Sequence, residues 1–248
     1  MCYVIFILEK VIACGGRHVC KVAEGIKKVS MAVVRRLPKY YSCLGDLIRG
    51  NVERVSSREL SKLLGFTASQ IRQDLNNFGG FGQQGYGYKV EQLYQEIANI
   101  LGLNLIHKMV IIGAGNLGQA LANYEEFEKF GFHILALFDV NPKLIGLKIR
   151  NIPVLDTEEL KSFIEDNKVD IGVITVPKGK VGDVINILSN TPIKGIWNFT
   201  PKKVNVKKRI IVENVHLTDS LFTLSYQLNQ DIFEKRCIEN KSKKTLNR

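Results

Sequence analysis

A glycine-rich turn between a continuous apolar run and a helical pattern restricts the fold of this chain more than any other segment. The apolar run is Met-Val-Ile-Ile at 109–112, the turn is Gly-Ala-Gly-Asn-Leu-Gly at 113–118, and the helical pattern continues through Phe130. A second apolar run, 134–138, ends at Asp139, 21 residues after the last glycine. A strand, a GxGxxG turn, a helix and a second strand ending in an acid form the βαβ unit of a dinucleotide-binding Rossmann domain.

The residue types in this turn meet the requirements of a bound dinucleotide. Gly113 would make a tight turn, Gly115 would let a pyrophosphate approach the backbone, and Gly118 would let the helix pack closely on the strand. Asp139 would accept hydrogen bonds from the adenosine ribose and repel a 2′-phosphate, so it is expected to serve the ligand and not the fold. The pattern predicts NAD(H) as the cofactor, bound through Gly113, Ala114, Gly115, Asn116, Leu117, Gly118 and Asp139.

Strands and helices continue to alternate up to about residue 216. Helices are expected at 158–166 and 181–188, and strands at 171–176, 195–199 and 210–215. This order predicts an α/β domain over 105–216 with an open, doubly wound parallel sheet. Such sheets bind ligands beyond the carboxyl ends of their strands. Four further residues near those ends are therefore expected at the cofactor site: Thr175, Val176, Pro177 and Asn198.

Residues 29–104 predict a separate N-terminal domain. Ser30 can cap a helix that Pro38 bends or ends, and a second helical stretch is expected at 40–48. Two more helices follow in close succession, since 56–59 and 67–70 both match the capping-box pattern. The glycine at 65 separates them, which is the arrangement of a helix-turn-helix.

The second of these two helices has two unlike faces. Ala68, Ile71, Leu75 and Phe78 recur at helical spacing and would pack inward. The opposite face carries Ser, Arg, Gln and Asn, of which Arg can pair with guanine and Gln or Asn with adenine. The alternative is a solvated amphipathic helix, for which Glu and Lys would be more usual. The pattern favours double-stranded DNA as a partner, contacted through Thr67, Ser69, Gln70, Arg72, Gln73 and Asn76.

A glycine-rich hairpin is expected directly after this helix. Residues 78–88 read Phe-Gly-Gly-Phe-Gly-Gln-Gln-Gly-Tyr-Gly-Tyr, with aromatic residues alternating with glycines. A helix-turn-helix followed by such a hairpin is typical of a winged helix, whose wing reaches the minor groove or the phosphates. The tip would contact DNA through Gln83, Gln84 and Gly85, and a helix at 90–101 would lead to the second domain.

Charge and cysteine usage agree with this organisation. Residues 1–90 carry 14 Lys and Arg against 6 Asp and Glu, whereas 91–200 carry 10 against 13. A basic module joined to a slightly acidic one fits a polyanion binder fused to a small-molecule domain, although solubility alone would explain the charge equally well. The five cysteines form no CxxC pair, as expected of reduced thiols in the cytoplasm. Cys14, His18 and Cys20 lack a fourth ligand, so no metal site is expected, and no apolar run is long enough to span a membrane.

A Rossmann domain is also compatible with an NAD-dependent oxidoreductase that carries an appended DNA-binding domain. Such an enzyme needs a substrate domain and a positioned proton donor, yet the four histidines are scattered. We therefore expect no catalytic residue and interpret the cofactor as a signal. A third alternative is an architectural DNA-binding protein with a vestigial nucleotide fold.

Six segments together resemble the Rex family of redox-sensing repressors: RRLPKYY (35–41), SSRELSKLLGFTASQIRQDL (56–75), FGGFGQQGYGY (78–88), GAGNLGQALANY (113–124), FDVNP (138–142) and NVHLTDSLFTLSY (214–226). The resemblance covers about 29–228. It implies a homodimer that exchanges C-terminal helices, represses genes of fermentation and NADH reoxidation while NADH is scarce, and leaves DNA when NADH binds. It also implies a redox-dependent hinge that includes Arg36 and Tyr124.

This chain departs from the family pattern at several positions. Many members carry a basic residue at the place of Gln73 and a basic pair at the place of Gln83 and Gln84, so fewer phosphate contacts are expected here. Gly80 replaces a common glutamate. His216 stands where other members carry an aspartate of the hinge.

The two ends of the chain are expected to differ from the domains. Residues 1–28 form an atypical extension with no pattern that joins them to the helix after Ser30. Residues 217–236 predict a dimerisation helix, and 237–248 a basic tail. The apolar stripe of that helix is Leu217, Leu221, Leu224, Leu228 and Ile232.

Overall fold

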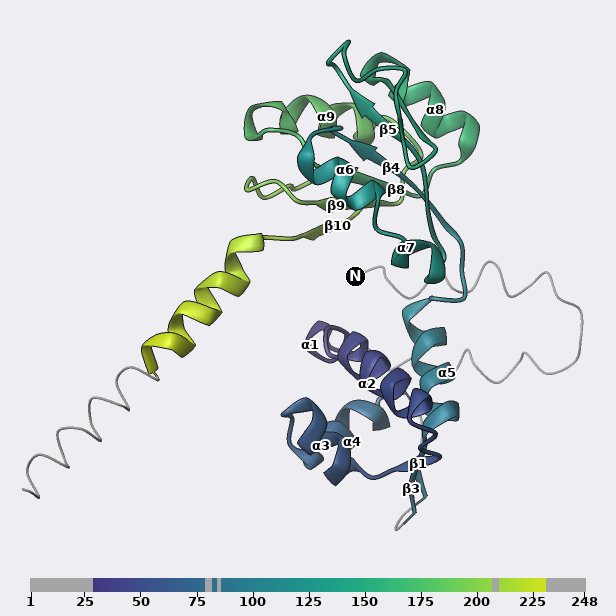
Figure 1. Ribbon diagram of the computed structural model, residues 1–248, viewed down its shortest axis with the longest axis vertical. Helices are drawn as coiled ribbons and strands as arrows, with labels where there is room; N and C mark the ends of the chain where they lie inside the picture. The colour runs from purple at the N-terminus through teal and green to yellow at the C-terminus, as the bar shows by residue number, and fades with distance from the viewer. Residues whose placement is uncertain (1–28, 79–81, 84–85, 207–209, 231–248) are drawn as a thin grey trace, which may run out of the picture. The chain divides into compact units, whose positions relative to one another are not determined.

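The computed structural model describes residues 29–78, 82–83, 86–206 and 210–230. The chain forms two compact units, Met1–Asn104 (unit 1) and Leu105–Arg248 (unit 2) (Figure 1). Residues 1–28, which include Cys14, His18 and Cys20, lie outside the described part. Within the described part, no helix has the length and apolar character needed to cross a membrane.

Unit 1 has the winged-helix arrangement. A small antiparallel sheet of order β1-β3-β2 lies beside helices that bury one apolar core. The elements are α1 (Met31–Val34), α2 (Leu37–Arg49), β1 (Arg54–Val55), α3 (Ser57–Leu64), α4 (Ala68–Asn76), β2 (Gly82–Gln83), β3 (Gly87–Lys89) and α5 (Val90–Leu101).

The helix starts predicted at Ser30, Ser56 and Thr67 are confirmed, whereas the helix expected at 40–48 begins earlier, at Leu37. Ser30 caps α1, and the Ser56–Glu59 capping box makes both of its hydrogen bonds, at 2.7 and 3.2 Å. The Thr67 hydroxyl accepts from the backbone N–H of Gln70 at 3.1 Å, which is one of the two bonds expected there. Pro38 is the second residue of α2 and does not end a helix. The first turn of a helix tolerates proline because its N–H has no intrahelical partner to lose.

The wing is also confirmed, and its third strand is new. β2 and β3 pair antiparallel with Gly82 opposite Tyr88. Strand β1, which the sequence did not predict, pairs with β3 and places Val55 opposite Tyr88. β1 is only two residues long, so it carries no periodic pattern from which a strand could be predicted.

Unit 2 is an α/β domain with one seven-stranded sheet of order β10-β9-β8-β4-β5-β7-β6. All neighbouring strands are parallel except β6 and β7. The strands are β4 (His107–Ile112), β5 (Phe132–Asp139), β6 (Lys148–Ile149), β7 (Ile152–Asp156), β8 (Ile171–Ile174), β9 (Gly195–Asn198) and β10 (Ile211–Asn214). The helices are α6 (Asn116–Ala122), α7 (Glu126–Lys129), α8 (Leu160–Asn167) and α9 (Val181–Ser189).

Two features of unit 2 correct the expectations. The hairpin β6–β7 was not predicted, and β7 extends the parallel sheet beyond β5. The single helix expected through Phe130 is divided into α6 and α7, with Asn123 as the C-cap of α6. Asparagine favours such an end because its amide competes with the helical backbone for hydrogen bonds.

The sheet of unit 2 is covered on both faces, as a parallel sheet requires. One face packs against α8 and α9 through residues such as Leu160, Ile164 and Leu188. The other face packs against α6, where Ala122 meets Met109 and Ile111 of β4 in one apolar cluster. The central strands β4 and β5 therefore have buried side chains on both sides and form a rigid base for the loops at their carboxyl ends.

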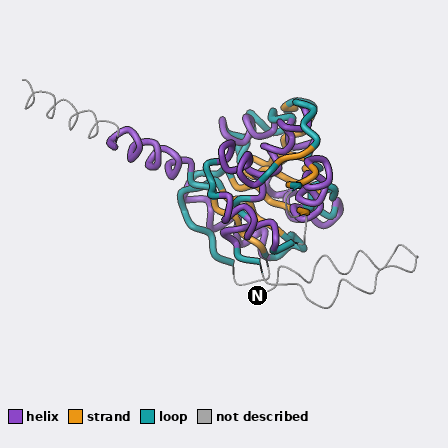
Figure 2. Tube along the Cα trace, turned by 90° about the horizontal axis from the view of Figure 1, so that it is seen from below, coloured by secondary structure: helices purple, strands orange, loops and turns teal. Residues whose placement is uncertain are grey.

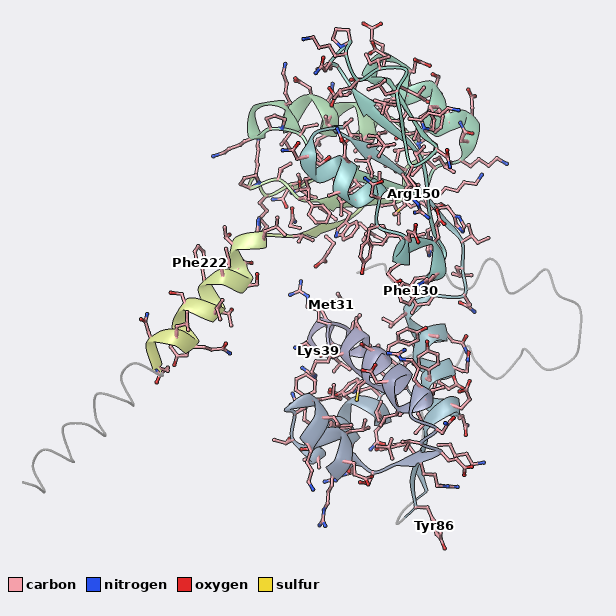
Figure 3. The ribbon with its side chains drawn as sticks, in the orientation of Figure 1. Met31, Lys39, Tyr86, Phe130, Arg150 and Phe222 are labelled. Carbon is pink, nitrogen blue, oxygen red and sulfur yellow. The ribbon has the colours of Figure 1, made fainter. Side chains whose placement is uncertain are left out.

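Residues 217–230 form one continuous helix after β10 (Figure 2). Its large apolar side chains are exposed, and Figure 3 shows Phe222 on its surface. The described part of the predicted stripe, Leu217, Leu221, Leu224 and Leu228, is 49–60% exposed. Ile232 lies outside the described residues.

Candidate nucleotide site and DNA interface

The predicted nucleotide loop lies where three neighbouring strands end. Residues 113–118 follow β4, Asp139 ends β5, and Thr175 follows β8. The backbone N–H of Gly113 donates to the Phe138 carbonyl at 2.8 Å, which ties the loop to β5. Because β4 pairs with β5 on one side and β8 on the other, the loop occupies the point at which the strand order reverses. Ligands of doubly wound sheets bind at this point.

The three glycines of the loop have distinct surroundings. Gly113 has a φ of 104°, and a Cβ there would lie 2.8 Å from the Thr175 carbonyl oxygen. A Cβ on Gly118 would lie 2.0 Å from the Gly113 carbonyl oxygen, so only glycine lets α6 approach the loop this closely. Gly115 is exposed, and a Cβ there would meet nothing within 4 Å. The roles predicted for Gly113 and Gly118 thus match the packing, and open space lies beside Gly115 for a pyrophosphate.

Asp139 serves the fold as well as a possible ligand, which corrects the expectation from sequence. Its Oδ2 accepts from the backbone N–H of Ala114 at 2.7 Å, and its Oδ1 accepts from the N–H of Asn141 at 2.9 Å. An ionised carboxylate has about four acceptor positions. Asp139 can therefore hold the glycine loop and still accept from ribose hydroxyls.

The second edge of the nucleotide site is built from β8 and β9. The Thr175 hydroxyl lies 2.8 Å from the Gly113 carbonyl oxygen, so it fixes the loop from the β8 side. Val176 is half-buried and Pro177 exposed. Asn198 is fully buried, and its amide holds the turn after β9 through Thr200, Lys202 and Asn214. Its hydrogen-bonding capacity is used within the protein, so Asn198 shapes the edge of the site instead of facing it.

The predicted DNA-reading face lies on α4. Ser69, Arg72, Gln73 and Asn76 are exposed, whereas Ile71 and Leu75 are buried, as the helical spacing predicted. The Arg72 guanidinium donates to the Ser57 hydroxyl at 3.0 Å, which holds it near the start of α3. The row therefore offers hydrogen-bonding groups to an external partner.

Sequence reasoning missed the buried acid of this helix. Asp74 is 3% exposed and accepts three hydrogen bonds of 2.7 Å, two from the Arg36 guanidinium and one from the Tyr40 hydroxyl. The hydrogen bond to Asp74 raises the pKa of Arg36, and burial raises the pKa of Tyr40. An acid at a position that faces the core was the available signal, because a buried carboxylate needs a partner.

The tip of the wing carries an exposed aromatic residue. Tyr86 is 70% exposed, and Figure 3 shows its side chain at the end of the wing. The Arg54 guanidinium donates to the Tyr86 carbonyl at 3.2 Å. Gln83 lies in β2, and Gln84 and Gly85 lie outside the described residues.

Comparisons with known proteins agree with this two-unit organisation. Residues 28–76 match the family described as putative DNA-binding protein N-terminus, and 104–202 match the family described as CoA binding domain. The redox-sensing transcriptional repressor Rex of Clostridioides difficile (strain 630) is 59% identical over 206 residues, which are 83% of this chain and 98% of the relative. The chain belongs to the Rex family. Rex of Thermoanaerobacter pseudethanolicus is 56% identical and covers 84% of this chain and 93% of its own.

Solved Rex structures share the fold. RSP, a Rex-family repressor, in complex with β-NAD⁺ and operator DNA is 55% identical, covers 85% of this chain and 97% of its own, and has a TM-score of 0.78. RSP in complex with β-NADH is 52% identical, covers 85% and 99%, and has a TM-score of 0.79. The predicted family and fold class are confirmed, and the chain is a transcriptional repressor and not an enzyme. Among the described residues, no group of three or more His, Cys, Asp or Glu side chains is arranged to hold a metal ion.

The three hinge residues implied by the Rex resemblance fall in both units. Arg36 lies in unit 1, where its guanidinium is bound to Asp74. Tyr124 is 53% exposed and packs edge-to-face on Phe127 of α7. His216 lies between β10 and the C-terminal helix, and its carbonyl accepts from the N–H of Asp219.

Proposed function

We propose that this Rex-family chain occupies operator DNA while NADH is scarce and leaves it when NADH binds. The observation that carries the proposal is one chain with both an exposed reading helix and a dinucleotide loop. RSP, its relative, has been solved with NAD⁺ and operator DNA and also with NADH. The genes that it represses are those of fermentation and NADH reoxidation. As a DNA-binding repressor, this protein acts in the cytoplasm.

NAD(H) fits the residues of the nucleotide site. The open space at Gly115 suits the pyrophosphate, beside the backbone of Ala114, Asn116 and Leu117. Asp139 retains acceptor positions for the ribose and would repel the 2′-phosphate of NADP(H). Gly113, Gly118 and Thr175 shape the loop, and Val176 and Pro177 continue its β8 edge. When bound, the cofactor supplies a redox-dependent difference in shape and charge at the nicotinamide, and no chemical step is required.

DNA contact is proposed for α4 and the wing. Arg72, Gln73 and Asn76 would meet base edges, with Thr67, Ser69 and Gln70 at the N-terminal end of the helix. Gln83, Gln84 and Gly85 would contact the sugar-phosphate backbone of the DNA without adding positive charge to the protein. The affinity should therefore depend less on salt than in relatives with basic residues at these positions.

A homodimer is proposed from two apolar surfaces of unit 2. The helix 217–230 exposes its leucines and Phe222. A hollow of about 350 Å³ on the sheet is lined by mainly apolar residues, including Phe127, Phe132 and Trp197. Exposed apolar patches of this kind on a soluble domain usually mark an interface, and two-fold symmetric dimers are the commonest oligomers. Arg36, Tyr124 and His216 remain the proposed hinge between DNA binding and cofactor binding.

Fluorescence anisotropy of a labelled operator duplex tests the proposal. NADH should release the protein at fixed salt, and NAD⁺ should do so far less. A ligand shifts an equilibrium only by its differential affinity for the two states, and a hundredfold difference supplies roughly 2.7 kcal/mol per site. Operator DNA must weaken NADH binding by the same factor. If saturating NADH leaves the DNA affinity unchanged, the sensor function is wrong even where both ligands bind.

A further inference from the structure

We infer that Asp74, held by Arg36 and Tyr40, is a positioning residue that fixes the rotation of α4 and thereby the sequence discrimination of the repressor. The inference rests on the proposed DNA-binding function of α4. Asp74 lies on the buried side of the helix, next in sequence to the exposed Gln73. Because an α-helix turns by about 100° per residue, Arg72 and Asn76 project about 160° away from Asp74, and Gln73 projects about 100° away from it.

The contacts of Asp74 are directional. Arg36 donates from Nε to Oδ2 and from Nη2 to Oδ1, both at 2.7 Å, and the Tyr40 hydroxyl donates to Oδ2 at 2.7 Å. A bidentate arginine–carboxylate pair defines an orientation as well as a distance. Both donors come from the start of α2, since Arg36 is its N-cap and Tyr40 lies in its first turns.

Apolar packing alone restrains the rotation of α4 about its axis less than the Asp74 hydrogen bonds do. Ile71 and Leu75 are fully buried and keep the helix on the core, but apolar burial has no preferred direction. Side chains extend about 5–6 Å from a helix axis, so a rotation of about 20° would move a base-reading atom by roughly 2 Å. Binding sites require positions within about 0.5 Å. The Asp74 contacts supply the restraint that the apolar residues lack.

These contacts also assign Arg36 a role in unit 1. Besides its proposed part in the hinge, the Arg36 guanidinium is bound to the buried face of the reading helix. Loss of either partner would leave the other without its ion pair, and Asp74 is almost fully buried. Arg36 and Asp74 are thus expected to act as one unit in DNA reading.

Asp74→Asn tests the inference with the least change of shape. The amide nitrogen would face a donor of Arg36 in place of one carboxylate oxygen, so the charge, the bidentate pairing and at least one of the three hydrogen bonds would be lost and the restraint on the helix weakened. Operator preference is the ratio of two affinities at the same salt: for a duplex with the RSP operator sequence and for a scrambled duplex of equal composition. This ratio should fall at least tenfold in Asp74→Asn, while NADH binding by unit 2 stays within twofold of the parent. Arg36→Lys, which keeps the charge but not the paired geometry, should show an intermediate ratio.

Ile97→Val is the matched control. Ile97 lies on α5 and is buried in the same core, but its side chain forms no hydrogen bond with Asp74 or Arg36. It should lower the melting temperature and leave the ratio unchanged. An unchanged ratio in folded Asp74→Asn and Arg36→Lys would overturn the inference and leave Asp74 a stabilising residue only. If Asp74→Asn does not fold, Arg36→Lys and Tyr40→Phe decide the outcome. A parent protein that shows no operator preference would instead refute the proposed function.

Discussion

Alanine substitution at two glycines of the nucleotide loop should distinguish a glycine that leaves space for the ligand from one that the packing of the fold requires. A Cβ on Gly118 would lie 2.0 Å from the Gly113 carbonyl oxygen, whereas a Cβ on Gly115 would meet nothing within 4 Å. Carbon and oxygen atoms in close contact are about 3.3–3.6 Å apart, so α6 or the loop would have to move by roughly 1.5 Å in Gly118→Ala. Gly115→Ala should leave the structure unchanged.

The two variants should therefore differ in stability. Overpacking of this kind costs about 1–3 kcal/mol. For a chain of this size each kcal/mol lowers the melting temperature by about 2–4 °C, so Gly118→Ala should melt about 2–12 °C below the parent. In Gly115→Ala the lost freedom of the unfolded chain contributes about 0.4–1 kcal/mol and offsets the weaker helix cap. Its melting temperature should match that of the parent.

NADH titration and thermal unfolding then complete the test. At 100 times the parent Kd, NADH should stabilise the parent by about 2.7 kcal/mol. Gly115→Ala should bind NADH more than tenfold more weakly, because its Cβ occupies the place of the pyrophosphate, and at the same NADH concentration it should gain no more than about 1.4 kcal/mol. It should also need correspondingly more NADH to leave operator DNA. Parent-like NADH affinity in Gly115→Ala would refute the assignment of the pyrophosphate to this space.

Three further predictions concern the other surfaces. Arg72→Ala should lose about 1–3 kcal/mol of operator binding and relax specificity at one base pair; equal weakening on scrambled DNA in the same anisotropy assay would mean a phosphate contact only. Leu221→Asp should dissociate the dimer in analytical ultracentrifugation, whereas the polar, exposed Gln227→Asp should not; a retained Leu221→Asp dimer would contradict the proposed role of the helix. The Ser56 hydrogen bonds lower the pKa of Glu59, so the contribution of the capping box is complete above the ordinary glutamate pKa and is lost as the pH falls through the lowered one. The melting temperature of Glu59→Gln should accordingly change less with acid pH than that of the parent, and equal changes would count against the box.

The sequence by itself determined the elements that depend on residues close together in the chain. The Ser56–Glu59 capping box, the hairpin around 82–88 and the glycine turn at 113–118 depend on residues a few positions apart, so their patterns can be read directly. The exposed row of α4 followed in the same way from helical spacing. The sequence pattern also predicted the order of strands and helices in unit 2, apart from the short hairpin β6–β7 and the division of one expected helix into α6 and α7.

Only the tertiary structure decided how distant residues meet. Asp74 is paired with Arg36 and Tyr40, which lie 38 and 34 positions away, and Asp139 holds Ala114 across 25 positions. Nothing in the spacing of these residues predicts their contact, because it arises when packing brings α2 onto α4 and β5 beside β4. The same holds for Asn198, a polar residue at a strand end that the sequence placed at the ligand. Packing buried it instead, and a buried amide must satisfy its hydrogen bonds within the protein.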